Sequence, residues 1–283
     1  MTPLVFTLIT FAVAIVAGFF GSILGLGGGI IVIPALSLLL GVDIRLAIGA
    51  GFVSVIATSS GAAAAYVREH MTNLRVAMFL EIGTTAGALT GALVAGIISP
   101  RILFLLFGLI LAYSAIRMLA RTREHATAVP PDQLADRLRL HDHYFDEADQ
   151  TTHHYRVTHT WLGLALMYIA GVVSGLLGIG SGSLKVPAMD LAMRLPIKVS
   201  TATSNFMMGV TAAAAAGIYF ARGDIHPLIA GPVAMGVLLG ATLGSRILGK
   251  LKSRLVRTVF VIVLLIVAAQ MLYKGFAGVP AHA

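Results

Sequence analysis

The strongest constraint in this sequence is a series of apolar runs, each near 20 residues long, separated by short charged patches. A helix of about 20 apolar residues spans a hydrocarbon core of roughly 30 Å. Hydrophobic residues make up 58% of the chain and charged residues 11%, against about 45–50% and about 25% in soluble domains. No long stretch alternates apolar and polar residues, which disfavours strands. The expected fold class is therefore an all-α polytopic membrane protein.

Composition also excludes several classes of function. The chain has no cysteine, so disulfides, thiolate metal sites and cysteine nucleophiles are ruled out. The net charge of +8 raises the alternative of a nucleic-acid partner. Lysine and arginine flank the apolar runs, however, where the positive-inside rule places them. We expect no nucleic-acid partner, and a lipid bilayer instead. The segment from Met1 to Leu24 lacks a basic n-region and has a matching segment later in the chain, so it is expected to be a membrane span.

The chain is an internal duplication. Displacing the sequence so that Pro34 falls on Pro187 aligns it with itself without a gap from Thr7 to Leu119, with roughly a quarter of the positions identical. The recurring residues keep one register, which chance matches in apolar sequence would not do. They include Gly18, Gly25, Gly27, Gly29, Pro34, Thr58, Tyr66, Gly83, Gly87 and Gly91, with partners Gly171, Gly178, Gly180, Gly182, Pro187, Thr211, Tyr219, Gly236, Gly240 and Gly244.

Each copy contains five segments, of which the second is short. They are expected at 3–24, 28–41, 46–67, 74–98 and 101–119, and at 160–177, 181–193, 199–220, 227–248 and 255–273. Membrane repeats at 1–119 and 160–283 then flank a linker at 120–159. A helix of about 14 residues is only about 21 Å long. The short segment therefore either crosses a locally thin region or re-enters on the side from which it came.

Charge counting favours the crossing. If the short segments cross, the copies are inverted, and 15 of the 20 lysines and arginines lie on one side, four on the other and Lys185 in the membrane. If they re-enter, the split is 10 against 9. The positive-inside rule then predicts five plus five segments in two inverted repeats, with both termini outside and the linker cytoplasmic.

The linker differs from the rest of the chain. "PDQLADRL" predicts a short helix, and the stretches on either side of "DEADQ" predict a two-stranded hairpin. Six histidines lie among acidic residues here, which raises Zn²⁺ or Ni²⁺ binding as an alternative to a solvated loop. No HxxxH or HExxH spacing occurs, so the expectation is no metal and no cofactor.

The glycine-rich stretches "GLGGGIIVIP" and "GIGSGSLKVP" occupy equal places in the two copies. Neither has the βαβ setting of a dinucleotide fingerprint or the GK[ST] of a phosphate loop. Ser181 as a membrane nucleophile would need a base, and no histidine lies in a predicted span of copy two. A helix broken at the glycines leaves backbone N–H groups that bind anions. The candidate binding residues are Gly27, Gly28, Gly29, Gly180, Ser181, Gly182 and Ser183. The alternative is close helix packing, which better fits the glycines spaced by four in the fourth segments.

Two further features in copy two point to an anionic ligand. Lys185 is a cation within an apolar segment, which is costly and usually faces a cavity or a partner; snorkelling to the interface is the alternative. Thr203, Ser204 and Asn205 supply hydroxyl and amide donors, or bond helix to helix. These residues have no polar counterparts in copy one, so the site is expected to be asymmetric.

Glu81 is a carboxylate in the fourth segment, and Ala234 stands opposite it in the repeat. A lone carboxylate in a membrane span indicates function by default. Glu81 is a candidate proton carrier. The alternatives are an ion pair with Lys185 or with Arg75.

The paired "GxxGxGxGxxxxP" stretches, and "VSTATSN" after the second, resemble the TauE/SafE sulfite-exporter family, also called TSUP transporters. The similarity covers about 5–120 and 160–273, and the linker "LHDHYFDEADQTTHHYRV" is similar to that of members with a long central loop. It implies transport of sulfur-containing anions across a bacterial inner membrane. Copy two departs from the commoner triple glycine at Gly180-Ser181-Gly182 and then carries Lys185.

The sequence thus predicts a non-enzymatic secondary transporter of sulfite or organosulfonates that works by alternating access. Proton coupling and a homo-oligomeric state stay open, as do export and uptake. The alternatives are an anion channel of the same fold and, less favoured, an intramembrane enzyme, for which no catalytic base is found. Scarce membrane carboxylates argue against a metal-ion transporter.

Overall fold

A computed structural model of the chain describes residues 2–120, 131–248, 250–251 and 253–277. The first half contains α1 (Pro3–Leu24), α2 (Gly29–Pro34), the π-helical turn η1 (Ala35–Leu39), α3 (Ile44–Arg68), α4 (Leu74–Ala95) and α5 (Pro100–Ala120). The linker contains α6 (Gln133–Arg137), β1 (Asp142–Asp146) and β2 (Thr151–Tyr155). The second half contains α7 (Thr160–Leu177), α8 (Gly182–Pro187), η2 (Ala188–Ala192), α9 (Ile197–Ala221), α10 (Pro227–Leu248) and α11 (Ser253–Ala277).

The predicted duplication is present element by element. The displacement that brings Pro34 onto Pro187 also brings the bounds of α2, η1, α3 and α4 onto those of α8, η2, α9 and α10. Among the described residues, α1, α3, α4, α7, α9 and α10 are long and apolar enough to cross a membrane. The protein is therefore an all-α polytopic membrane protein, with one small two-stranded sheet in the described linker.

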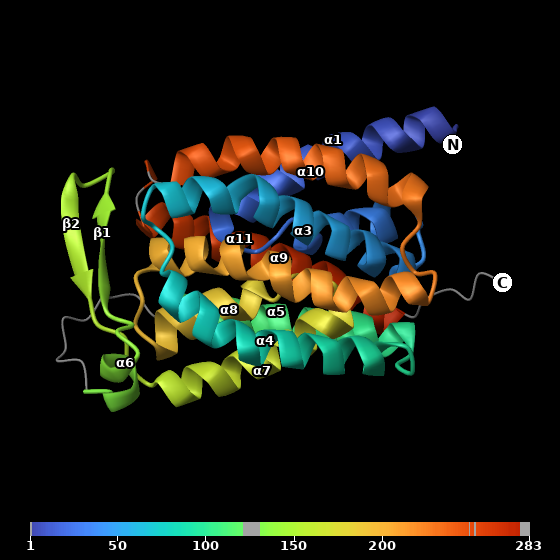
Figure 1. Cartoon of the computed structure of the whole chain (residues 1–283). Coiled ribbons are helices and arrows are strands. Elements are labelled where there is room, and N and C mark those ends of the chain that lie inside the picture. The colour runs from blue at the N-terminus through green and yellow to red at the C-terminus, as the bar shows by residue number, and fades with distance from the viewer. Residues whose placement is uncertain (1, 121–130, 249, 252, 278–283) are drawn as a thin grey trace.

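The two repeats run in opposite directions. In Figure 1, α1 begins at the end of the bundle where α11 finishes, whereas α7 begins at the opposite end, beside the hairpin. We call these the terminal end and the linker end. The start of α3 lies at the terminal end, because Gly49 contacts the Asp224 carbonyl in the α9–α10 turn. The start of α9 lies at the linker end, where Lys198 contacts Asp146 of β1. The fold is thus two inverted repeats of five segments.

The short segment of each repeat takes the chain back to the end at which the repeat began. Thr158, just before α7, donates its N–H to the carbonyl of Met193, just after η2, at 3.3 Å. This path agrees with the predicted inversion. One detail differs from five full crossings: the turn between the long and the short helix is enclosed by protein, since all residues of 21–30 are buried. The backbone of this turn is therefore surrounded by protein and does not reach the water at the membrane surface.

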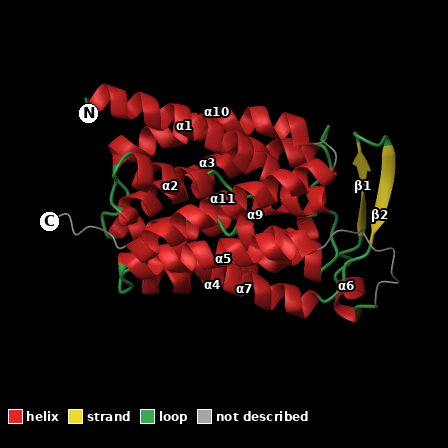
Figure 2. Ribbon diagram, turned by 180° about the vertical axis from the view of Figure 1, so that it is seen from behind, coloured by secondary structure: helices red, strands yellow, loops and turns green. Residues whose placement is uncertain are grey.

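The repeats exchange packing partners. α1 packs along α10, and α4 along α7, each pair lying side by side in Figures 1 and 2. Glycines line both contacts: a Cβ atom on Gly240 would collide with the Ile15 carbonyl, and one on Gly87 with the Tyr168 carbonyl. The packing interpretation of the glycines spaced by four in the fourth segments is therefore confirmed.

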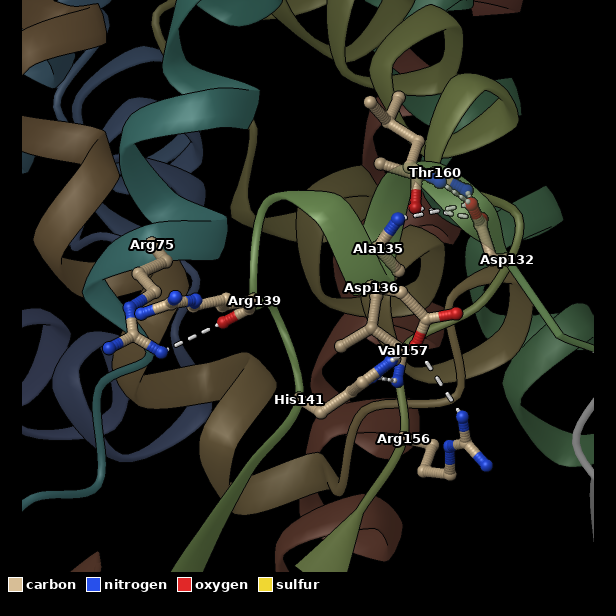
Figure 3. A network of polar contacts seen from close by, with 10 residues as sticks. Arg75, Asp132, Ala135, Asp136, Arg139, His141, Arg156, Val157 and Thr160 are labelled. Carbon is tan, nitrogen blue, oxygen red and sulfur yellow. Dashed lines mark hydrogen bonds and ion pairs between the residues drawn. The ribbon is translucent and has the colours of Figure 1, made fainter.

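The linker hairpin and short helix form as predicted. β1 and β2 are antiparallel, with Asp142 opposite Tyr155 and Asp146 opposite Thr151. Figure 3 shows how the base of the linker is tied to the bundle. Asp132 caps α6 and accepts hydrogen bonds from the N–H and hydroxyl of Thr160 at 2.7 and 2.8 Å. These bonds outweigh the effect of burial, which acts to raise the pKa of Asp132, so that its pKa falls below the ordinary value.

Candidate functional site

The two glycine-rich breaks lie against each other inside the bundle. Gly25, Gly27, Gly178 and Gly180 have φ between 66° and 73°, a region that glycine tolerates and most residues avoid. A Cβ atom on Gly29 would lie 2.6 Å from the Gly178 carbonyl oxygen, and one on Gly182 would collide with the Gly25 carbonyl. Each short helix therefore begins on the break of the other repeat, and only glycine allows this approach.

Protein groups satisfy part of the exposed backbone in each break. The N–H of Gly28 donates to the Thr58 hydroxyl of α3 at 2.9 Å. Ser181, the counterpart of Gly28, has φ of 57°, and its hydroxyl donates to the Gly180 carbonyl at 2.7 Å. The donor groups predicted to meet an anion are thus partly engaged within the protein in this state.

Side chains of both repeats cap the carbonyl ends of the broken helices. The hydroxyl of Tyr66 donates to the Ser22 carbonyl, and that of its counterpart Tyr219 to the Gly175 carbonyl, each at 3.0 Å. These two bonds are related by the internal repeat.

The predicted donors of α9 separate into two places. Ser204 and Asn205 lie at the first break, where Ser204 donates to the Gly25 carbonyl at 3.0 Å and the Asn205 amide to the Ser22 carbonyl at 2.7 Å. Thr203 instead accepts from the N–H of Asn73 at 3.1 Å, in the turn between α3 and α4.

Lys185 and Glu81 come together through a hydroxyl. Lys185 Nζ donates to Thr211 Oγ1 at 2.7 Å and lies 3.6 Å from Glu81 Oε2. Thr211 Oγ1 donates to Glu81 Oε1 at 2.6 Å. Thr84 and Thr85 also donate to the carboxylate, at 3.1 and 2.8 Å. The side chain of Lys185 is 0% exposed and that of Glu81 13%.

This network decides two alternatives left by the sequence. A fully buried Lys185 does not snorkel to the interface. Glu81 pairs with Lys185 rather than with Arg75, whose guanidinium donates to the Arg139 carbonyl at 2.9 Å in the linker (Figure 3). The counterparts of Lys185 and Glu81 are Val32 and Ala234, so the charged network belongs to one repeat only.

Several buried polar atoms near the crossing have no hydrogen-bond partner among the described residues. Ser54 Oγ and Thr201 Oγ1 are two of them. A Cβ atom added to Gly28 would collide with Ser54 Oγ, and Thr201 packs on Gly25. The Ser183 hydroxyl of α8 and the Asn205 carbonyl oxygen are also without a partner. Buried polar groups are normally satisfied by protein or by water, so these four atoms, among nine of this kind in the described residues, are candidates for contact with a polar ligand or with water.

A cavity of about 220 Å³ opens at the terminal end. Arg45, Tyr219, Arg222 and Asp224 line it, together with Ile48 and residues of α4 and α5. The Arg222 guanidinium lies 4.3 Å over the Tyr219 ring and its Nε lies 3.4 Å from Asp224 Oδ2. Two arginines against one aspartate give this entrance a surplus of positive charge.

At the linker end, a second buried ion pair joins the hairpin to the bundle. Lys198 Nζ lies 2.6 Å from Asp146 Oδ1, with side-chain exposures of 0% and 2%. Asp146 also lies within 4.8 Å of ligand atoms of Asp149 and His153, a set able to hold a metal ion, although exposed acidic groups often cluster without one.

Sequence reasoning missed the roles of Thr58, Thr211, Tyr66 and Tyr219, although all four recur in the repeat. Polar residues that keep their register in two apolar copies were the available signal. No comparable signal marked Ser54, or the pairing of Lys198 with Asp146, which lies 52 residues earlier.

Comparison with known proteins agrees with this architecture. The family model described as "Sulfite exporter TauE/SafE" matches residues 10–271. The chain is 27% identical to the "Probable membrane transporter protein YunE" of Bacillus subtilis over 92% of this chain and 95% of that protein. It is 28% identical to a "Probable membrane transporter protein" of Xylella fastidiosa, covering 93% and 94% of the two chains. No solved structure matches it. Since the family model spans nearly the whole chain, the protein belongs to the TauE/SafE sulfite exporter family of membrane transporters.

Proposed function

We propose that the protein carries small sulfur-containing anions, such as sulfite or organosulfonates, across a bacterial inner membrane by alternating access. One observation carries the proposal: unpartnered buried hydroxyls and a fully buried lysine surround the crossing of two broken helices. The crossing is enclosed by protein, which favours a site exposed to one face at a time over an open channel. The absence of an identified catalytic base in the sequence favours transport over enzymatic chemistry.

In this proposal the anion binds at the crossing in a state in which the two breaks have moved apart, because in the described state they are in contact. The donors come from Gly27, Gly28, Gly29, Gly180, Ser181, Gly182 and Ser183, with Lys185 supplying charge and Ser204 and Asn205 supplying polar groups from α9. Thr203, also on α9, accepts from the Asn73 N–H of the α3–α4 turn and is the remaining proposed contributor. The oxygens of a sulfonate or sulfite suit such donors, because hydrogen bonds to a charged acceptor are about twice as strong as neutral ones.

The Lys185–Glu81 pair suggests how a proton enters the cycle. When both groups are ionised, Glu81 offsets the charge of Lys185 at 3.6 Å and leaves little attraction for an anion. Protonation of Glu81 leaves the lysine charge uncompensated, so that one anion and one proton bind with no net charge. Glu81 is therefore our candidate for proton coupling.

We also propose that both termini lie outside and the linker in the cytoplasm. The sequence count for five crossing segments in each repeat puts 15 of the 20 lysines and arginines on the side of the linker, which supports this orientation. Reporter fusions at either end test this orientation, and a cytoplasmic signal from either terminus would overturn it.

Reconstitution into liposomes tests the function. Labelled sulfite or sulfoacetate inside the vesicles should leave faster when the same anion is present outside, because a carrier exchanges and a channel does not. An inward proton gradient should change the rate in the native protein and not in Glu81→Gln. Stabilisation of the purified protein by cations alone, with no response to sulfur anions, would refute the anion proposal.

A further inference from the structure

The internal repeat pairs residues at the terminal end of the bundle, where the cavity opens, with residues at the linker end. Lys198 is the counterpart of Arg45, and each is the second residue of the third helix of its repeat. Arg45 lines the open cavity at the terminal end, together with Ile48 and Tyr219. Their counterparts at the linker end are Lys198, Thr201 and Tyr66. Lys198 is 0% exposed whereas Arg45 is exposed, and the other two positions are buried at both ends.

The linker hairpin covers that second entrance. Figure 1 shows β1 and β2 standing across the linker end of the bundle. Asp146, the last residue of β1, brings a carboxylate to Lys198 at 2.6 Å. The N–H of Ala148 donates to the same oxygen at 2.9 Å, and the Tyr144 hydroxyl donates to the other oxygen at 3.3 Å. An ammonium, an N–H and a hydroxyl are the donors that a small free oxyanion would use.

The covered position is close to the glycine crossing. Thr201 follows Lys198 by about one helical turn and packs against Gly25. Ser204 follows by one more turn and donates to the Gly25 carbonyl. A ligand leaving Lys198 toward the centre of the bundle therefore reaches the first break within about two turns of α9, roughly 10 Å.

The hairpin is held by different contacts at its base and at its tip. Asn73, in the α3–α4 turn, holds the base through the Leu140 carbonyl and the Tyr155 hydroxyl, at 2.9 and 3.0 Å. Near the tip, burial and then the Glu147 carboxylate raise the pKa of Glu69, and Lys250 acts in the opposite direction. Hydrogen bonds to Asn73 thus hold the base of the hairpin, and the ion pair of Asp146 with Lys198 holds its far end.

From these observations we propose that the linker hairpin is a gate, and that Asp146 occupies on Lys198 the site where the transported anion binds at the linker entrance. The inference rests on the proposed anion transport for the identity of the ligand, but not for the movement of the hairpin. In the described state the terminal entrance is open and the linker entrance is closed by this internal carboxylate. An anion that replaces Asp146 on Lys198 both opens the gate and enters the path.

The absence of cysteine in the native chain makes the gate directly testable. Thr201→Cys places a thiol behind the hairpin, and Ala14→Cys places one in the buried α1–α10 contact, away from the gate. Each is exposed to a small water-soluble methanethiosulfonate in lipid nanodiscs, so that both faces are accessible. With Asp146→Asn, labelling of Thr201→Cys should accelerate about tenfold or more, the factor expected for loss of a charge-assisted hydrogen bond.

Two controls make the result specific. Asp142→Asn removes a carboxylate from the exposed start of the same strand and should leave the rate unchanged. Ala14→Cys should stay unreactive, which separates gate opening from unfolding. If Asp146→Asn unfolds the protein, Ala148→Pro removes one donor to the carboxylate, keeps both charges, and provides the same readout. Equal labelling of Thr201→Cys with and without the gate substitution would overturn the proposal.

Protection by ligand separates this inference from the function on which it rests. In the opened variant, sulfoacetate should slow the labelling of Thr201→Cys, because it binds at Lys198. Opening without protection by any sulfur anion would support the gate as a moving element and refute Lys198 as the anion site. Transport in liposomes without any opening would leave the function standing and refute the gate.

Discussion

Replacement of Lys185 by methionine tests the centre of the site most directly. Methionine keeps the length of the side chain and removes the charge and the donor to Thr211. Glu81 then stays in place, 13% exposed, with three threonine hydroxyls and no cation. Because this charge is inside the membrane region, the substitution should destabilise the protein and also abolish anion binding.

The magnitude follows from the burial of the pair. Removal of one partner from a buried ion pair costs about 3–5 kcal/mol, since the other charge is left uncompensated. The three hydroxyls still stabilise the carboxylate, so we expect a value near the lower limit, about 3 kcal/mol. With a fall in Tm of about 2–4 °C per kcal/mol, Lys185→Met should lower Tm by roughly 6–12 °C.

A double-substitution cycle identifies the pair as the cause. Glu81→Gln together with Lys185→Met removes both charges, so the double variant should be more stable than Lys185→Met alone. Lys250→Met, which removes an exposed lysine, should change the stability by less than about 1 kcal/mol. Thermal unfolding followed by circular dichroism measures the native protein and the four variants. If the effects of Lys185→Met and Glu81→Gln simply added, the two residues would not form an energetically coupled pair, and our interpretation of the network would be wrong.

Three further predictions concern packing, capping and pH. Gly240→Ala should destabilise the protein strongly because the added methyl meets the Ile15 carbonyl, whereas Gly231→Ala in the same helix meets nothing within 4 Å and should be neutral or stabilising by up to about 1 kcal/mol; thermal unfolding compares them, and equal effects would contradict the packing. Tyr219→Phe leaves the Gly175 carbonyl without its donor and should cost about 1–3 kcal/mol in the same assay, whereas the exposed Tyr273→Phe should cost nothing measurable. Burial acts to raise the pKa of Asp146, but Lys198, the Ala148 N–H and Tyr144 outweigh it and lower the pKa. Docking should therefore be complete above the ordinary carboxyl pKa of about 4 and be lost as the pH falls through the lowered value. Spin labels on Thr151→Cys and Arg68→Cys should report a distance that lengthens only below about pH 4; lengthening already near pH 6 would show that Asp146 is not the group that controls docking.

The main architecture was predictable because it depends on patterns repeated along the chain. The short second segments and the glycines spaced by four each appear twice, at one constant displacement along the chain. A pattern that recurs in this way is hard to produce by chance. The direction of the repeats followed from charge, because lysines and arginines are costly to move across a bilayer. Hydropathy shows that a helix crosses the membrane, but it does not show which helix lies beside it. The exchange of partners between α1 and α10 was therefore not predicted.

Prediction of the site was limited because the sequence does not show which side chains lie next to each other. Lys185, Glu81, Ser204 and Asn205 could be proposed as site residues because polar groups are conspicuous in apolar segments. The pairing of Lys185 with Glu81 was among the alternatives, but the threonine hydroxyls that join and surround these two groups were not recognised. Threonine and serine occur throughout membrane helices, so nothing in the local sequence distinguished Thr211 or Ser54 from others. The position of Thr203, away from the breaks, depends on how α9 is rotated about its axis.

The exchange of partners also has a consequence for biosynthesis. The glycine face of α1 at Gly18 packs on Val237 of α10, which the ribosome adds only near the end of translation. At about 5–20 residues per second, α1 waits on the order of 10–40 s in the membrane before its partner is made. During that interval it is open to premature association with other newly inserted helices. Neither half has a complete set of neighbours until translation is nearly finished, so a polypeptide truncated before α10 should be a substrate for membrane quality control.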